Sequence, residues 1–368
     1  MSRASCAQIT FTDTITPPNN YSVNYTNDNP PPAVDANYFT TAQAQRIANS
    51  LSNSNAASTG NPNGYHNGYV NLGFSASSFG GAGNVNIFNC GLIGGCDSGN
   101  ALADRIQMPA GNYLASAEPC LRLVIGHELF HHVQYAYINF SNWSAWGTAP
   151  VEGGARVMQD KVYSDLDSNS GCITCKGATA DWLNTPDQNV WISSYTFALF
   201  WNYLMEQLGV TNTEPQIGVD FMQNFWQRTH TATNAGNIDF PGTLRNTIAS
   251  VSTARTLEEL YQDFAIANYT KLMDVSSLPN SSRYKYKDEN EASGDVYIDV
   301  AKAISTPLDF GGVSGNVSVS MWGTEYYVVR PSWPLYRRQE QRGRLRRRRR
   351  RDELGARLDD GHGAGEAH

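Results

Sequence analysis

The residues best suited to chemistry lie in the segment His127-Glu128-Leu129-Phe130-His131, an HExxH pattern. Residues four apart share one face of an α-helix, with Cβ atoms about 5–6 Å apart, so both imidazoles can reach one metal ion. Glu128 follows the first imidazole near the same face, where its carboxylate can take a proton from a metal-bound water. The spacing indicates a zinc site with His127 and His131 as ligands and Glu128 as general base.

A catalytic zinc site needs a third protein ligand and an open coordination position, whereas a structural zinc normally has four protein ligands. Glu152 follows His131 after twenty residues, in a predicted helix that begins after Pro150. A helix returning at this distance can pack against the first one and deliver a carboxylate. We therefore expect one catalytic Zn2+ bound by His127, His131 and Glu152.

The motif lies within an apolar helical stretch that is expected to begin near Ala117, with Pro119 in its first turn. Residues 52–67, rich in Asn, Ser and Gly, are predicted to be a loop. Other helices are predicted at 41–51, 150–162, 193–208, 217–228 and 256–272, the last opening with the capping-box pattern Thr256-Leu-Glu-Glu. Strands are predicted at 21–25, 84–88, 103–108, 295–300, 316–320 and 326–329.

His-Glu-Leu-Phe-His, followed by Glu152-Gly-Gly-Ala155, resembles the gluzincin metallopeptidases, notably secreted bacterial members of undetermined substrate. The likeness covers about residues 105–210. It implies that Glu152 is the third zinc ligand and that the chain hydrolyses peptide bonds through a zinc-activated water. Tyr137 occupies the position of the third metzincin histidine, which excludes that clan.

The resemblance also suggests supporting residues around the metal. Related sites use a Tyr or His from a later helix to stabilise the oxyanion, so Tyr195 is the first candidate and His230 the second. Many gluzincins have an aspartate four residues after the ligand glutamate, where this chain has Arg156. Asp160, one turn further on, is the candidate carboxylate for hydrogen bonding a ligand histidine.

The expected fold is α+β: a gluzincin-like zincin with a small mixed sheet, the metal helix behind it and a mostly helical lobe, followed by a β-rich C-terminal module. The strand at 103–108 is expected to offer an edge to an extended substrate. The domain boundaries are a metallopeptidase domain at 1–282, with an α/β part at 1–148 and a helical lobe at 149–282, then an incomplete β-rich module at 283–330 and an Arg-rich tail at 331–368.

The charge distribution separates the tail from the body. Eleven of the 27 basic residues follow Arg330, which leaves 16 basic and 28 acidic residues before it. An acidic body gives no electrostatic footprint for nucleic acid. The tail has three interpretations: a nucleic-acid or membrane-binding arm, a disordered segment, or residues read in a shifted coding frame, which we favour.

Composition and cysteines favour a secreted protein. Uncharged polar residues and aromatics are abundant, and the cysteine count of six is even. Cys90 with Cys96, and Cys172 with Cys175, are candidate loop disulfides. No apolar run is long enough for a transmembrane segment, and the first residues lack the apolar stretch of a signal peptide.

The sequence is compatible with three functions. The first is a zinc peptidase acting on a peptide or protein substrate. The second is a zinc hydrolase that cleaves another acyl bond on the same scaffold. The third is an inactive or non-enzymatic surface-binding protein built on a zincin fold.

Overall fold

The structure is a computed structural model, and it forms two compact units, residues 1–302 with 319–324 and residues 303–318 with 325–368. The described residues are mostly helical and include few strands. They are 13–15, 21–25, 40–52, 64–75, 84–87, 100–102, 105–108, 118–159, 161–162, 183, 185–191, 195–213, 216–271, 273–287, 304–309, 324 and 327–330.

A small mixed sheet in the first unit has the strand order β1-β2-β3-β5-β4. The central pairs β2–β3 and β3–β5 are parallel, and the outer pairs β1–β2 and β5–β4 are antiparallel. Alternate residues of β2 and β5 are buried, as expected for strands with one face on the core. The strands are β1 (Asp13–Ile15), β2 (Ser22–Tyr25), β3 (Asn84–Ile87), β4 (Asn100–Leu102) and β5 (Arg105–Met108).

The strands expected at 21–25, 84–88 and 103–108 correspond to β2, β3 and β5, while β1 and β4 were not anticipated. The prediction that 103–108 forms an edge is wrong, because β5 is flanked by β3 and β4. Within the described sheet, the edge next to the HExxH helix is β4.

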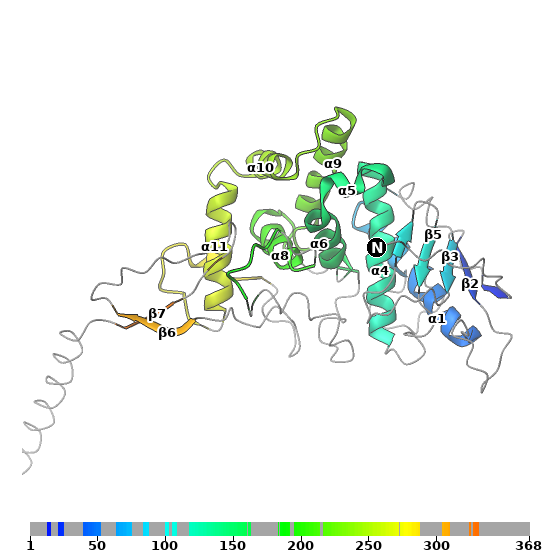
Figure 1. Cartoon of the computed structure of the whole chain (residues 1–368), viewed down its shortest axis with the longest axis horizontal. Coiled ribbons are helices and arrows are strands. Elements are labelled where there is room, and N and C mark those ends of the chain that lie inside the picture. The colour runs from blue at the N-terminus through cyan, green and yellow to red at the C-terminus, as the bar shows by residue number, and fades with distance from the viewer. Residues whose placement is uncertain are drawn as a thin grey trace, which may run out of the picture. The chain divides into compact units, whose positions relative to one another are not determined.

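Helices make up the rest of the first unit (Figure 1). Those predicted at 41–51, 150–162, 193–208, 217–228 and 256–272 are present with shifted ends, and the helix at 240–251 was not anticipated. The helices are α1 (Thr41–Ser52), α2 (Gly64–Asn71), α4 (Glu118–Ile138), α5 (Trp143–Trp146), α6 (Thr148–Met158), α8 (Phe197–Leu208), α9 (Val219–Asn234), α10 (Phe240–Val251) and α11 (Leu257–Thr270), with 3-10 turns η2 (Phe140–Asn142) and η5 (Ser281–Tyr284).

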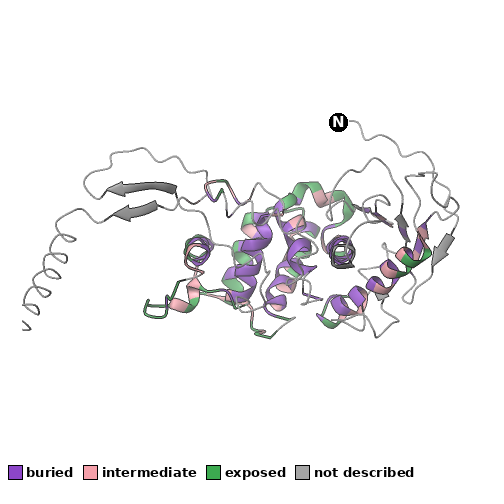
Figure 2. Ribbon diagram, turned by 90° about the horizontal axis from the view of Figure 1, so that it is seen from below, coloured by how far each residue is buried: buried purple, intermediate pink, exposed green. Residues whose placement is uncertain are grey.

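Helix α4, which carries the HExxH segment, is the central element of the first unit. It packs against α1, α2 and β4 on the sheet side and against α6 and α9 on the helical side (Figure 1). Every residue from Arg122 to Gln134 is buried. A helix that is buried on all sides is held by its neighbours around its whole circumference. Figure 2 shows how buried residues, in purple, concentrate on the helices of this unit.

Helix α2 corrects the prediction that residues 52–67 are entirely loop. Its sequence, Gly-Tyr-His-Asn-Gly-Tyr-Val-Asn, has low intrinsic helix propensity because it contains two glycines and two asparagines. Tyr65 and Tyr69 lie one turn apart and are fully buried, and α2 packs on α1 and α4. Tertiary burial of these two rings therefore compensates for the weak local preference.

The second unit contains one described sheet, formed by the parallel strands β6 (Ile304–Asp309) and β7 (Tyr327–Arg330). Strand β7 agrees with the predicted strand at 326–329, and β6 was not anticipated. The strands predicted at 295–300 and 316–320 lie outside the described residues. Two strands do not establish the β-rich module, which stays a prediction.

Several other predictions concern parts of the chain that the structure does not describe. The tail at 331–368 and five of the six cysteines lie outside the described residues, and the side chain of Cys120 is not described. The disulfides and secretion therefore stay predictions. None of the helices in the described part of the chain has the length and apolar character that a membrane span requires.

Candidate metal centre

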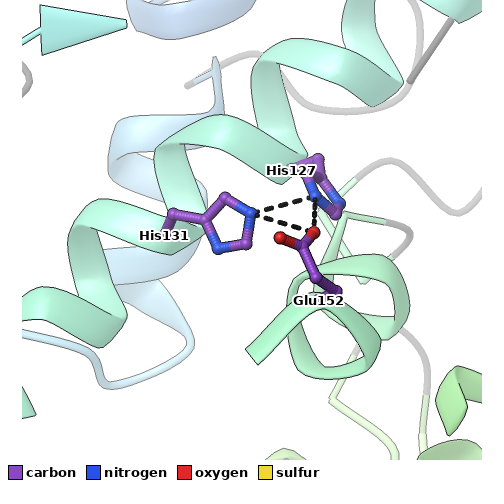
Figure 3. Close-up of side chains that lie close together, drawn as sticks. All are labelled: His127, His131 and Glu152. Carbon is purple, nitrogen blue, oxygen red and sulfur yellow. Dashed lines mark hydrogen bonds and ion pairs between the residues drawn. The ribbon is translucent and has the colours of Figure 1, made fainter. Parts of the chain in front are cut away.

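Two consecutive helices bring the predicted ligands together. His127 and His131 lie on α4, one turn apart, and Glu152 lies in the second turn of α6, which packs on α4. Helix α6 begins at Thr148, two residues earlier than predicted, with Pro150 in its first turn, where a missing N–H breaks no helical hydrogen bond. Figure 3 shows both imidazole rings and the Glu152 carboxylate pointing toward one another.

The three donor atoms form a compact triangle. His127 Nε2 lies 3.0 Å from His131 Nε2 and 3.1 Å from Glu152 Oε2. His131 Nε2 lies 3.4 Å from the same carboxylate oxygen. The two histidines are buried, and Glu152 is partly exposed. Within the described part of the chain, this is the group of His, Cys, Asp or Glu side chains close enough to hold a metal ion.

The donor set fits a divalent metal with an open position. Zinc bonds of about 2.0–2.1 Å in tetrahedral geometry place ligand atoms about 3.3–3.4 Å apart, close to the separations found here. Two imidazoles and one carboxylate leave the fourth tetrahedral position for water or substrate. Imidazole and carboxylate ligands accept zinc and several other divalent ions.

Glu152 and His131 shift each other's ionisation. Burial by itself raises the pKa of Glu152, but the charges of His131 and His127 and their hydrogen bonds outweigh burial and lower that pKa well below its usual range. Burial by itself lowers the pKa of His131, but the attraction and hydrogen bonding of Glu152 raise it above its ordinary value. The carboxylate and the two imidazoles therefore interact strongly where their donor atoms meet.

Glu128 is buried next to the triangle, on the same helix. Burial raises its pKa above the ordinary carboxyl value, against the lowering influence of the two histidines and of a hydrogen bond from the Ala101 backbone N–H. The Ala101 carbonyl oxygen accepts a hydrogen bond of 3.0 Å from the hydroxyl of Tyr135. Both backbone groups of Ala101 are therefore directed at α4, which positions the edge strand β4 beside Glu128.

The other predicted residues have different outcomes. The Tyr195 ring lies next to His127, with ring centroids 5.7 Å apart, so the first oxyanion candidate is beside the site. His230 is on α9, exposed, and its Nδ1 lies 3.2 Å from the carbonyl oxygen of Tyr137. Tyr137 follows His131 by six residues on α4, so this contact lies about 9 Å from His131 along the helix axis. Asp160 lies outside the described residues.

Two residues near the metal centre were missed by sequence reasoning. The Trp143 ring stacks at a tilt on His131, with centroids 4.6 Å apart, and also contacts Tyr135. Gln134 Oε1 lies 2.7 Å from His131 Nδ1. Gln134 follows His131 by three residues, a spacing that places side chains side by side on a helix. This spacing was the available signal for Gln134. No comparable spacing points to Trp143, the first residue of the short helix α5.

Comparison of the chain with protein-family models, with curated proteins and with solved structures finds no match. The interpretation of the site therefore rests on its residues and their geometry.

Proposed function

We propose that this chain is a zinc-dependent peptidase of the gluzincin type. The observation that carries the proposal is the convergence of His127 Nε2, His131 Nε2 and Glu152 Oε2, with Glu128 buried beside them. A structural zinc site would normally add a fourth protein ligand, and the described part of the chain contributes three. A general base next to an open coordination position suits hydrolysis.

Each residue then has a role in peptide hydrolysis. A zinc ion at this site would supply Lewis-acid character and lower the pKa of a coordinated water. Glu128 takes the proton from the attacking water, and its raised pKa suits a carboxyl that must both accept and return a proton. The same carboxyl then protonates the leaving amine. The hydroxyl of Tyr195 donates a hydrogen bond to the oxyanion of the scissile carbonyl.

The neighbouring residues support these roles. The Ala101 N–H holds the Glu128 carboxylate, so the base keeps one orientation. Trp143 covers one side of the His131 ring and restricts the access of bulk water to that ligand. Exclusion of water strengthens electrostatic interactions in the site, which increases the effect of each charged group on the developing oxyanion.

The first test is the metal content of chelator-free protein by elemental mass spectrometry, with His131→Ala for comparison. We expect one zinc per chain and its loss in the variant. Wild-type protein that takes up no metal, even after incubation with zinc, would remove the basis of the proposal.

The second test is cleavage of a peptide library by wild type and by Glu128→Gln. The variant should keep its zinc and lose about 10²–10⁴-fold in kcat. Glu258→Gln, the same chemical change at an exposed residue of α11, should leave cleavage unchanged. Full activity of Glu128→Gln would contradict the assigned base. Hydrolysis of esters without peptides would indicate another zinc hydrolase, and bound zinc without any turnover would indicate a binding protein.

A further inference from the structure

Gln134 is fully buried between the two ligand-bearing helices, and both ends of its amide are bonded. Its Nε2 donates a hydrogen bond of 2.8 Å to the carbonyl oxygen of Val151, the residue before Glu152. Its Oε1 lies 2.7 Å from His131 Nδ1. Gly154 leaves room for this amide, because a Cβ at that position would come within 3.2 Å of Gln134 Nε2. One side chain thus links a ligand on α4 to the turn of α6 that carries another ligand.

The Val151 contact determines which way the amide points. A carbonyl oxygen only accepts hydrogen bonds, so the end of Gln134 that faces Val151 must be its NH2 group. The opposite end is then the carbonyl oxygen, which also only accepts. His131 Nδ1 must therefore carry a hydrogen and donate it to Gln134.

This donor assignment sets the form of the neutral imidazole. A neutral histidine has one N–H, so a hydrogen on Nδ1 leaves the lone pair on Nε2. Nε2 is the atom that lies 3.0 Å from His127 Nε2 and 3.4 Å from Glu152 Oε2. The opposite tautomer would put a hydrogen between His131 and the Glu152 carboxylate, where a metal ion has to bind.

We propose that Gln134 is a positioning residue, which holds His131 in the Nδ1–H tautomer and joins it to the backbone that carries Glu152. The inference rests on the proposed metal site, and it does not depend on whether the substrate is a peptide. Partners of this kind orient ligand imidazoles and raise their basicity, and their loss typically costs 10–100-fold in metal affinity.

Two substitutions separate the tautomer from simple packing. Gln134→Met keeps a similar volume and loses both hydrogen bonds. Gln134→Glu keeps an acceptor for His131 Nδ1–H but cannot donate to Val151 when ionised. We expect the zinc affinity, measured by competition with a chromophoric chelator and normalised to the folded fraction, to fall about 10–100-fold in Gln134→Met. Gln134→Glu should recover part of this affinity, because it keeps the partner of His131 Nδ1–H and loses the link to Val151.

Tyr69→Phe is the matched control, because the Tyr69 hydroxyl also joins α4 to α6, through the carbonyl oxygens of Gly126 and Met158. This variant should lose some stability and keep the zinc affinity of wild type. Equal losses of affinity in the two Gln134 variants would overturn the tautomer assignment and leave Gln134 a packing residue. A loss in Tyr69→Phe as large as in Gln134→Met would overturn it as well.

Imidazole ¹⁵N chemical shifts of metal-free wild type give a second measurement, which is independent of metal binding and of activity. At a pH where the ring is neutral, His131 should show a protonated Nδ1 and an unprotonated Nε2. A hydrogen on Nε2 would overturn the proposal. If the chain bound no zinc, the proposed function would fail, and these shifts would still decide the role of Gln134. Normal zinc binding without peptide cleavage would contradict the proposed peptidase activity, but not the proposed role of Gln134.

Discussion

The hydroxyl of Tyr69 lies 2.8 Å from the carbonyl oxygen of Gly126, the residue directly before His127, the first of the two candidate ligand histidines. The same hydroxyl lies 3.3 Å from the carbonyl oxygen of Met158, at the end of α6. The neighbouring Tyr65 donates a hydrogen bond of 3.0 Å to the carbonyl oxygen of Gln159. Helix α2, which contributes no residue to the His127, His131 and Glu152 cluster, therefore joins the two helices that carry it.

Gly126→Ala should destabilise the protein, although Ala is a better helix former. Helix propensity alone would make the change favourable by about 0.8–1.0 kcal/mol. A Cβ at this position would lie only 2.3 Å from the ring of Tyr65, however, and overpacking of this kind costs about 1–3 kcal/mol. The denaturant midpoint should fall, and the double variant with Tyr65→Leu should lose less than the sum of the single changes. A rise in the midpoint for Gly126→Ala would show that Tyr65 moves aside freely.

The pKa of Glu128 predicts a pH-dependent gain in stability for Glu128→Gln in metal-free protein. The pKa of this carboxyl is raised in the folded chain, so folding is favoured below its ordinary value of about 4.5 and ionisation reduces stability as the pH rises. Glutamine does not titrate. The melting temperature of the variant should therefore rise, relative to that of wild type, as the pH increases from 4 to 7.

Glu258→Gln provides a control of opposite sign for this measurement. The hydrogen bond from Arg245 lowers the pKa of Glu258, so its contribution to stability is present above the ordinary pKa and is lost in acid. This variant should lose stability relative to wild type over the same pH interval. A constant difference in melting temperature between Glu128→Gln and wild type at both pH values would contradict the role of burial at Glu128.

The cluster of His127, His131 and Glu152 was largely predictable because its signal is local. A four-residue spacing on a helix fixes the relative position of His127 and His131, and an apolar stretch around them identifies the helix. To predict Glu152 as the third residue, it was enough to assume that the following helix packs back against the first one. The groups that contact the cluster and its neighbour Glu128 were harder to predict from the sequence. The Ala101 N–H reaches Glu128 through the pairing of short strands, and no spacing in the sequence specifies that contact.

The fold was predictable where local pattern and tertiary environment agree, as in α11. It was not predictable where tertiary burial overrides helix propensity, as in α2. There the burial of Tyr65 and Tyr69 stabilises a helix whose glycines and asparagines have low helix propensity. His66, in the same helix and within the segment predicted to be loop, is partly buried, and its Nδ1 lies 2.9 Å from the Tyr21 hydroxyl. Burial lowers its pKa accordingly.

The start of α11 offers a test that is independent of the metal centre. The Thr256 hydroxyl accepts a hydrogen bond from the backbone N–H of Glu259, and the Glu259 carboxylate accepts one from the backbone N–H of Thr256. Thr256→Ala should cost about 1 kcal/mol in the free energy of unfolding, because an N-terminal N–H loses its partner. Thr256→Ser keeps the oxygen and should stay near wild type in denaturant unfolding. Equal losses in both variants would mean that the methyl group of Thr256, and not its hydroxyl, supports the helix.

Tyr195→Phe separates a catalytic hydroxyl from an aromatic ring that only packs on His127. The ring is retained in the variant, so the contact with His127 and the zinc content should be unchanged. Loss of one oxyanion donor typically lowers kcat by about 10²–10³-fold, with little effect on KM, since the bond forms only as the charge develops. Steady-state cleavage of a peptide substrate measures both constants. Tyr286→Phe removes a hydroxyl that bonds Asn268 in the helical part of the unit, and it should leave kcat at the wild-type value. A wild-type kcat in Tyr195→Phe would assign Tyr195 to packing, and the oxyanion donor would then have to come from another residue.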